Sequence, residues 1–222
     1  MIPVITIDGP SGSGKGTIAQ NVASQLGWNI LDSGSLYRLT ALACIQEKID
    51  FEDEASVEAI ARNLPVSFNS TQQGLKILLK NEDVSDAIRE ENIGMAASKV
   101  AALGGVREAL LERQRAFVSE PGLIADGRDM GTTVFPQAGL KIFMTASCEE
   151  RAQRRYKQLK EKGISVSLAA LVADLKARDE QDSNRSISPL KPADDAIVID
   201  SSDMTIEQVT QKVLDLANQA FC

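Results

Sequence analysis

The sequence predicts a doubly wound α/β fold, in which a parallel five-stranded sheet carries helices on both faces. Five short apolar runs, rich in β-branched residues, are separated by segments with helical periodicity. These runs occupy residues 2–7, 28–31, 123–125, 140–144 and 196–199. Polar motifs that contain glycine follow the first three runs. Because ligands of such folds gather beyond the carboxyl ends of the strands, these motifs mark the expected site.

The first motif, from Gly9 to Thr17, reads GPSGSGKGT and is typical of a phosphate-binding loop. A strand pattern precedes it and a helical pattern follows, which is the context that such a loop needs. Glycines permit positive φ values, so several N–H groups can point at one phosphate. Lys15 adds a mobile charge that reaches the β and γ phosphates of a nucleotide. The predicted loop comprises Gly9, Pro10, Ser11, Gly12, Ser13, Gly14, Lys15, Gly16 and Thr17.

Gly16 departs from the general consensus G-x-x-x-x-G-K-[ST], because a hydroxyl appears only at Thr17. The side chain of residue 16 therefore cannot bind magnesium directly. A dinucleotide-binding G-x-G-x-x-G loop fits poorly, since Lys15 has no role in it. The alternative interpretation is a glycine-rich turn that binds no phosphate and contains a lysine by chance. The strand and helix patterns on either side disfavour it.

The first helix is predicted to end at Gly27, and a second helix is expected to resume near Leu36 after the motif DSGSLYR. The connection to the third apolar run is too long for a simple crossover and predicts an insertion with antiparallel strands. Its expected parts are a helix at 57–64, strands at 65–68 and 75–79, a turn at 81–83, and helical residues 93–118 interrupted at Gly104-Gly105.

Capping signals predict the last three helices. Ser147 with Glu150, and Thr205 with Gln208, have the spacing of a capping box. Another helix is expected to begin near Ser167. The helices that are expected to begin near Ser147 and Ser167 carry Arg151, Arg154, Arg155 and Arg178.

The composition is that of an ordinary globular protein, with 43% hydrophobic and 25% charged residues in a chain of 222. No apolar run approaches the roughly 18 residues that a membrane span needs, and no export signal is recognised. A net charge of −7 disfavours nucleic acid as a partner. The three cysteines lack metal-site or disulfide spacing, which favours the cytoplasm. The absence of histidine removes the commonest general base.

Several arginines are placed where they could hold phosphate groups. Arg38 and Arg128 follow the ends of two strand patterns, so a second phosphate could face the loop at Gly9 to Thr17. Phosphoryl transfer depends mostly on positioning and on charge stabilisation, and arginine serves both. A phosphate acceptor is already largely ionised near neutrality, so no general base is required. Two further groups of charged residues lie at helical spacing. The first is Arg151, Arg154 and Arg155, and the second is Arg178, Asp182 and Arg185. Taken by itself, each group could be a helix face that is exposed to solvent.

Four motifs together resemble the bacterial-type cytidylate kinases, which are nucleoside monophosphate (NMP) kinases of the P-loop superfamily. They are GPSGSGKGT, LDSGSLYR, IADGRDMGT and ARDEQDSNR, and the resemblance extends over essentially the whole chain. The family's loop also reads GKGT. The resemblance implies the P-loop NTP hydrolase fold with a core domain (1–36, 107–147 and 168–222), an NMP-binding domain (37–106, with a small antiparallel sheet around 63–102) and a lid (148–167).

The resemblance also implies transfer of the γ-phosphoryl group of ATP to CMP or dCMP by a cytoplasmic monomer. Mg²⁺ would arrive with ATP, with no direct protein ligand and with Thr17 nearby. Gly9 to Thr17 and the lid arginines Arg151, Arg154 and Arg155 would bind ATP. The catalytic residues would be Lys15, Arg128 and Arg185. The residues implied for CMP are Ser33, Arg38, Ser98, Arg107, Arg128, Asp129, Arg178 and Asp182.

Within the implied CMP site, Ser98, Arg107 and Asp129 would read the base, while Arg178 and Asp182 would bind the pentose. Cytosine offers an amino donor beside two acceptors, so a carboxylate next to an arginine matches its edge. Uracil would turn an acceptor toward Asp129. We therefore expect CMP and dCMP to be preferred over UMP.

Two other functions fit parts of the sequence. A P-loop kinase for another small acceptor, such as a sugar acid, would share the loop, but DSGSLYR and the acceptor arginines disfavour it. A nucleotide-binding regulatory module of the GTPase type would need a guanine-reading N-K-x-D motif, which the sequence lacks. A structural protein with a degenerate loop is disfavoured by the intact Lys15.

Overall fold

The computed structural model describes residues 2–71, 74–161 and 163–221. The chain divides into two compact units. The first unit comprises Met1–Asp32 and Arg115–Cys222, and the second comprises Ser33–Gln114. Among the helices of the described ranges, none is both long and apolar enough to cross a membrane.

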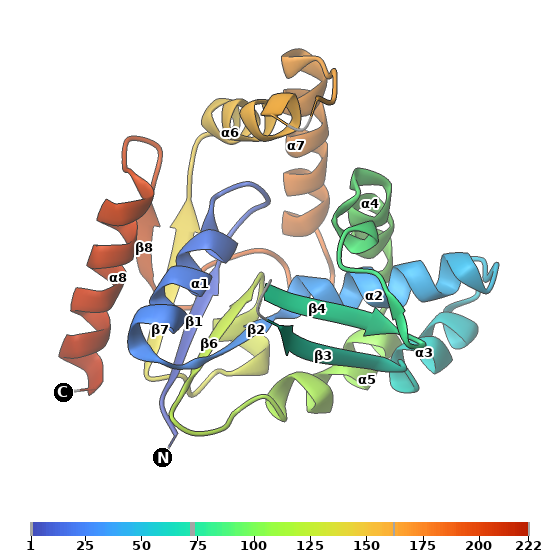
Figure 1. Cartoon of the computed structure of the whole chain (residues 1–222), viewed down its shortest axis with the longest axis horizontal. Helices are drawn as coiled ribbons and strands as arrows, with labels where there is room; N and C mark the ends of the chain where they lie inside the picture. Colours follow the sequence, from blue (N-terminus) through green and yellow to red (C-terminus); the bar gives the residue numbers. More distant parts are fainter. Residues whose placement is uncertain (1, 72–73, 162, 222) are drawn as a thin grey trace. The chain divides into compact units, whose positions relative to one another are not determined.

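The first unit is built on a five-stranded parallel sheet, as the sequence predicted (Figure 1). In spatial order the strands are β2, β6, β1, β7 and β8, so the first strand lies in the centre. Their bounds are Asn29–Asp32 (β2), Leu123–Gly127 (β6), Val4–Asp8 (β1), Leu140–Thr145 (β7) and Ile197–Asp200 (β8). The central strands are buried, which explains why they read as continuous apolar runs.

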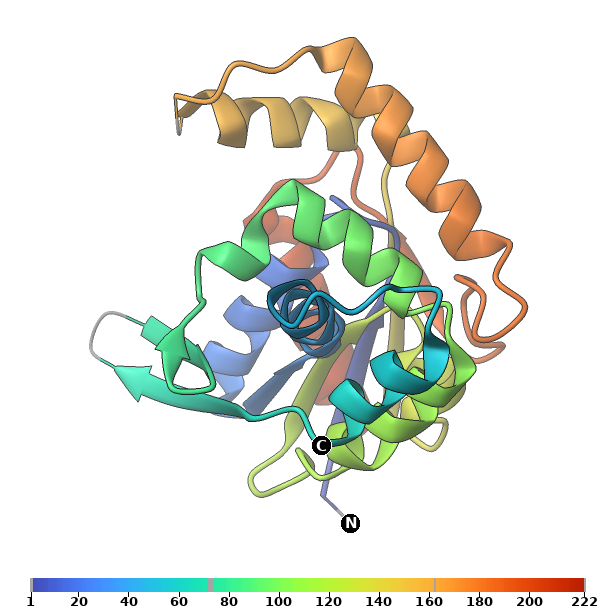
Figure 2. The ribbon, with the colours of Figure 1, turned by 90° about the vertical axis from the view of Figure 1, so that its right-hand side faces the viewer.

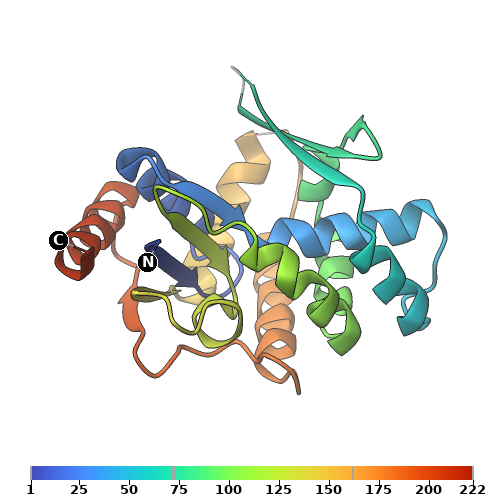
Figure 3. The same ribbon diagram turned by 90° about the horizontal axis from the view of Figure 1, so that it is seen from below.

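The helices of this unit follow from their caps and apolar stripes. They are α1 (Lys15–Leu26), α6 (Cys148–Glu161), α7 (Leu168–Ser183) and α8 (Ile206–Phe221). Helix α1 ends where Gly27 takes a left-handed φ of 67°, and the predicted capping box of α8 forms, with Thr205 and Gln208 bonding reciprocally at 3.2 and 2.9 Å. Helices α1 (blue) and α8 (red) lie side by side (Figure 3). Their apolar faces pack with Ile5 and Ile7 of β1 into one core.

Side chains alternate along β1, and this sends two polar residues to the opposite face of the sheet. Ile5 and Ile7 face the core under α1 and α8, so Thr6 and Asp8 face the other way. There the chain after β6 forms a π-helical turn, Met130–Val134, which the sequence analysis did not predict. This turn contacts β1 and becomes important for the site.

The second unit contains the predicted insertion with its antiparallel sheet. In chain order its elements are α2 (Ser33–Gln46), α3 (Glu54–Arg62), β3 (Val66–Thr71), β4 (Gly74–Leu79), β5 (Glu82–Asp83), η1 (Ala87–Arg89), α4 (Glu91–Val100) and α5 (Gly104–Arg115). Leu39 and Ala43 of α2 belong to the same small buried core as Ile77 and Leu79 of β4. The antiparallel strands of this unit are drawn in teal in Figure 2.

Three expectations for the second unit differ from the structure. Helix α2 begins at Ser33, directly after β2, and not near Leu36. Two residues of the expected turn at 81–83, Glu82 and Asp83, form β5. The helical region is interrupted as predicted, but at residues 101–103, and Gly104 and Gly105 begin α5. A Cβ atom at Gly105 would overlap the carboxylate of Glu58, so a larger residue there would displace that side chain.

Candidate active site

The segment Gly9 to Thr17 connects β1 to α1 and has the backbone geometry of a phosphate-binding loop. Gly9, Gly12 and Gly14 have φ values of 152°, 77° and 89°, a region that other residues rarely adopt. A Cβ atom at Gly9 would overlap the carbonyl oxygen of Met144 in β7. The sharp turn of the loop therefore depends on glycine at its first position.

Lys15 is the first residue of α1 and is nearly buried beneath the loop. Its Nζ donates a hydrogen bond of 3.1 Å to the carbonyl oxygen of Pro10, so the ammonium group lies inside the curve of the loop. Burial lowers the pKa of Lys15, and the positive charge of Arg128 lowers it further, while Asp126 acts in the opposite direction. A negatively charged phosphate would satisfy this cation.

Asp126 lies beside the loop, although the sequence analysis did not single it out. A Cβ atom at Gly16 would be 3.1 Å from its Oδ2 atom. Burial raises the pKa of Asp126; Lys15 counteracts this effect, and Asp32 adds to it. Asp126 lies at the end of β6, next to β1 in the sheet, and begins the motif DGRD. This position could have indicated a site residue, because ligands of such folds gather at the carboxyl ends of the strands.

The residues around Gly16 fit a magnesium ion that is bound mainly by nucleotide phosphates. The Oδ1 atom of Asp126 is buried and has no hydrogen-bond partner among the described residues. Mg²⁺ prefers oxygen ligands and is commonly held by one or two carboxylates together with substrate phosphates. Within residues 2–71, 74–161 and 163–221, no cluster of three or more acidic, cysteine or histidine side chains could hold a metal. Thr17 is exposed at the start of α1.

Arg128 and Arg185 are held together by the buried carboxylate of Asp182. Nε of Arg128 donates to Asp182 Oδ2 at 2.9 Å, and Arg185 pairs with the other oxygen. Burial would raise the pKa of Asp182, but the two guanidinium groups outweigh burial and lower it. Although α7 ends at Ser183, Arg185 therefore stays on the same side as Asp182. The structure brings together three of the predicted site residues here.

The predicted residues of the second unit come from three helices. Ser33 begins α2 and donates a hydrogen bond of 2.6 Å to Gln114 Oε1. Gln114 is buried near the end of α5 and was missed, because a single glutamine in a helix gives no sequence signal. Ser98 is buried in α4, and Arg38 of α2 donates to the carbonyl oxygen of Ile88 at 2.7 Å.

Arg107 of α5 is buried and fixed by two groups of its own unit. Its guanidinium carbon lies 5.6 Å from the ring centroid of Tyr37, a cation–π distance. Nη1 donates to the carbonyl oxygen of Ala101 at 3.1 Å. Tyr37 belongs to the motif DSGSLYR, so this motif also positions an arginine through its aromatic residue.

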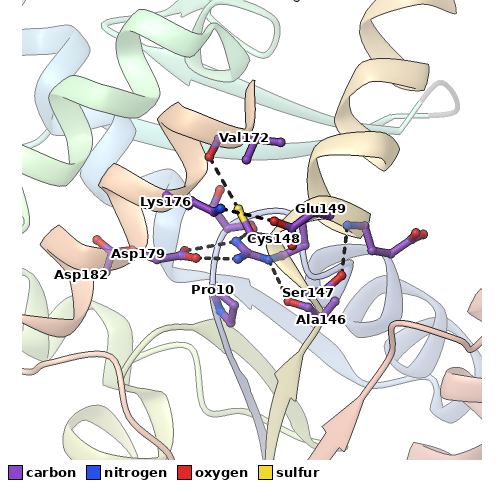
Figure 4. A network of polar contacts seen from close by, with 12 residues as sticks. Pro10, Ala146, Ser147, Cys148, Glu149, Val172, Lys176, Asp179 and Asp182 are labelled. Atoms are coloured by element: carbon purple, nitrogen blue, oxygen red, sulfur yellow. Dashed lines mark hydrogen bonds and ion pairs between the residues drawn. The ribbon is translucent and has the colours of Figure 1, made fainter. Parts of the chain in front are cut away.

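The three predicted lid arginines lie on α6, which packs against α7. Arg151 is buried and binds Asp179 of α7 with both Nη atoms, at 3.1 and 2.5 Å. Figure 4 labels Asp179, whose carboxylate takes both of these dashed lines. Arg151 also donates to the carbonyl oxygens of Ala146 at 3.0 Å and Ser11 at 2.9 Å, so it ties the phosphate-binding loop to both helices. Arg154 donates to the Ser201 carbonyl oxygen at 2.6 Å. Arg155 is half-buried.

We expect the buried pair of Arg151 and Asp179 to stabilise the fold. Arg151→Lys and Asp179→Asn should each lower the free energy of unfolding by about 1.5–3 kcal/mol, because each leaves a charged partner incompletely bonded. The double variant should lose less than the sum, and urea unfolding at pH 7 measures all three. Glu149→Gln and Lys176→Met, which disrupt an exposed pair of the same two helices at 3.3 Å, serve as controls. Additive losses for Arg151 and Asp179 would contradict this expectation.

Comparison with known proteins identifies the family. The family model described as cytidylate kinase matches residues 5–219. The chain belongs to the cytidylate kinase family. Among members of this family, the cytidylate kinase of Aeromonas salmonicida (strain A449) is 55% identical over 219 residues, which cover 99% of this chain and 95% of that protein. The cytidylate kinase of Pseudomonas syringae pv. tomato (strain ATCC BAA-871 / DC3000) is 58% identical over 214 residues, covering 96% and 93%.

Membership of the cytidylate kinase family confirms the predicted resemblance, and the five-stranded parallel sheet with its loop after β1 confirms the predicted P-loop fold. A solved gluconokinase from Sinorhizobium meliloti 1021 also matches, with a TM-score of 0.48 and 14% identity over 98% of this chain and 93% of that one.

Proposed function

We propose that this chain transfers the γ-phosphoryl group of ATP to CMP or dCMP, which gives ADP and CDP or dCDP. The observation that carries the proposal is the cluster of Arg128, Asp182 and Arg185, which belongs to the same compact unit as the phosphate-binding loop. A cytidylate kinase needs positive charge for two phosphates, and this cluster supplies it beyond Lys15. Membership of the family supports the choice of acceptor.

The proposed reaction needs little covalent chemistry from the protein. An oxygen of the acceptor phosphate attacks the γ-phosphorus, and the bond to the β–γ bridging oxygen breaks as ADP leaves. The N–H groups of the loop and Lys15 bind the β and γ phosphates, while Arg128 and Arg185 stabilise the charge on the transferring group. The acceptor oxygen is already ionised near neutral pH, so a chain without histidine can catalyse the step.

Mg²⁺ is the metal that we propose for this site. We revise the expectation that it has no direct protein ligand and propose that Asp126 would hold it together with the nucleotide phosphates. The ion supplies neutralisation of phosphate charge when it is bound with ATP. Gly16 assists because it lacks a side chain that would press on the Asp126 carboxylate. Thr17 remains a candidate for a position near the ion.

For the acceptor nucleotide we propose the roles that the family resemblance suggests. Ser33, Arg38 and Arg128 bind its phosphate side. Ser98, Arg107 and Asp129 read the cytosine. Arg178 and Asp182 bind the pentose; Asp182 can do so while paired with two arginines, since each carboxylate oxygen accepts more than one hydrogen bond. For ATP we propose the loop together with Arg151, Arg154 and Arg155.

The domain roles are also proposals. Residues 37–106 would form the NMP-binding domain, residues 148–167 the lid, and the remainder the core. We further propose that the protein acts as a cytoplasmic monomer without a nucleic-acid partner.

Release of ADP from ATP across a panel of acceptors tests the proposed function. With CMP, dCMP, UMP, AMP, GMP and gluconate at equal concentration, we expect turnover to be fastest with CMP and dCMP. Turnover with gluconate alone would favour a small-metabolite kinase. Binding of ATP without any acceptor-dependent turnover would favour a regulatory module and would contradict the proposal.

A further inference from the structure

Asp8 is a buried carboxylate that the proposed mechanism does not use. It is the last residue of β1, directly before Gly9 of the phosphate-binding loop, and it is 5% exposed. Both of its oxygens accept backbone hydrogen bonds from one distant segment. Oδ1 accepts from the N–H of Met130 and Oδ2 from the N–H of Gly131, each at 2.8 Å.

These two N–H groups open the π-helical turn at Met130–Val134. The first N–H groups of a helical segment have no partner within the segment and need an external acceptor. Asp129 occupies the N-cap position, yet its side chain makes no capping hydrogen bond. The cap is supplied instead by Asp8, which lies more than 120 residues earlier in the chain.

The backbone at Gly131 approaches β1 closely. A Cβ atom there would be 3.0 Å from Thr6 Oγ1 and 3.4 Å from Asp8 Oδ2, so a larger residue would require these side chains to shift by a few tenths of an ångström. The two residues that precede the turn are Arg128 and Asp129. The carboxylate of Asp8 therefore fixes the backbone next to two residues that we assign to the acceptor.

We propose that Asp8 is a positioning residue of the acceptor site, which holds Arg128 and Asp129 in place by anchoring the following backbone to the strand that carries the phosphate-binding loop. This inference rests on the proposed function. Asp8 does not touch the substrate; it acts through the N–H groups of Met130 and Gly131.

The surroundings of Asp8 make this anchor sensitive to pH. Burial raises the pKa of Asp8 to about 6, although its two backbone hydrogen bonds oppose the rise. Among the charged groups nearby, Asp129 raises the pKa and Lys15 lowers it, and Asp126 is a further acidic neighbour. Lys141 of β7 lies with its aliphatic side-chain carbons next to Gly131, and its ammonium group forms an ion pair with Asp195 at 2.9 Å. Protonation of Asp8 would turn a hydroxyl toward a backbone N–H and break one of the two bonds.

Asp8→Asn tests the proposal, because it keeps the shape of the side chain but replaces one acceptor by an amino group. At pH 8 we expect the KM for CMP to rise about 10-fold, since one buried N–H loses its partner. The KM for ATP should change much less. The preference for CMP over UMP should also fall. Asp53→Asn, at an exposed helix cap in the second unit, is the control and should change none of these values.

The pH profile separates positioning by the carboxylate from a general structural effect. The phosphate of CMP itself titrates near about 6, so the informative quantity is the ratio of the two KM values for CMP, variant over wild type. We expect this ratio to fall toward one as pH decreases from 8 to 5, because the wild-type protein loses its carboxylate in that range.

Three outcomes would overturn the inference. They are a folded Asp8→Asn variant with an unchanged KM for CMP, an equal rise in the KM for ATP, and a KM ratio that does not change with pH. If thermal unfolding shows that Asp8→Asn does not fold, Asp8→Glu is measured in its place, because it keeps the charge but displaces it by one methylene. A wild-type KM for CMP in the Asp8→Glu variant would then overturn the inference. Failure of the proposed function is distinct, since wild-type protein would then lack CMP-dependent turnover.

Discussion

Lys15→Met is expected to lower kcat by about 10²–10³-fold, the loss typical of removing one group that stabilises charge in the transition state. The ammonium group of Lys15 lies inside the loop, 3.1 Å from the Pro10 carbonyl oxygen, where nucleotide phosphates would replace that contact. Methionine fills nearly the same volume without the charge. Since burial already disfavours the charged form of Lys15, the melting temperature should not fall.

Steady-state kinetics with ATP and CMP, together with thermal unfolding at the same pH, measure both parts of this prediction. Lys212→Met is the matched control, because Lys212 is exposed on α8. Its turnover should equal that of the wild-type protein. A Lys15→Met variant that retains wild-type turnover would remove the loop from the mechanism, whereas one that fails to fold would show that Lys15 is structural.

Asp129→Asn is expected to shift acceptor choice from CMP toward UMP. A carboxylate can only accept, which matches the amino group of cytosine, while an amide can also donate to the O4 atom of uracil. We expect the ratio of kcat/KM for CMP to that for UMP to fall by about 10–100-fold, since mispaired buried polar groups cost about 1–3 kcal/mol. Arg107→Ala, which removes the other proposed reader of the base, should lower the same ratio.

The control for acceptor choice is Arg62→Ala, which removes a side chain that is 57% exposed and paired with Glu58 on α3. Its CMP to UMP ratio should equal that of the wild-type protein. If both Asp129→Asn and Arg107→Ala leave the ratio unchanged, these residues do not read the base.

The local signals in the sequence were sufficient for the parallel strands and the α-helices of the first unit. Each strand of the parallel sheet is a separate apolar run, and the caps at Gly27 and Thr205 define helix ends through interactions within a few residues. Elements that depend on distant partners were missed. The turn at Met130–Val134 exists because Asp8 caps it from another strand, and no pattern within residues 130–134 reports that contact.

The same distinction applies to the site. Glycines, Lys15 and the arginines were recognisable because their residue types and spacing indicate phosphate binding. Asp126 and Gln114 were not, because a carboxylate at a strand end and a glutamine within a helix are common in any protein. Their importance comes from what lies beside them, Gly16 in one case and Ser33 in the other.

The division of the chain into its two units has a consequence for synthesis on the ribosome. The second unit is one contiguous segment, Ser33–Gln114, so it possesses all its own partners before the rest of the chain has emerged. Strand β1 is made first but pairs with β6 and β7, which end at Gly127 and Thr145. The strands that flank the phosphate-binding loop are therefore complete only after more than half of the protein has been translated. A chain truncated before β6 contains the whole loop motif but does not form the site.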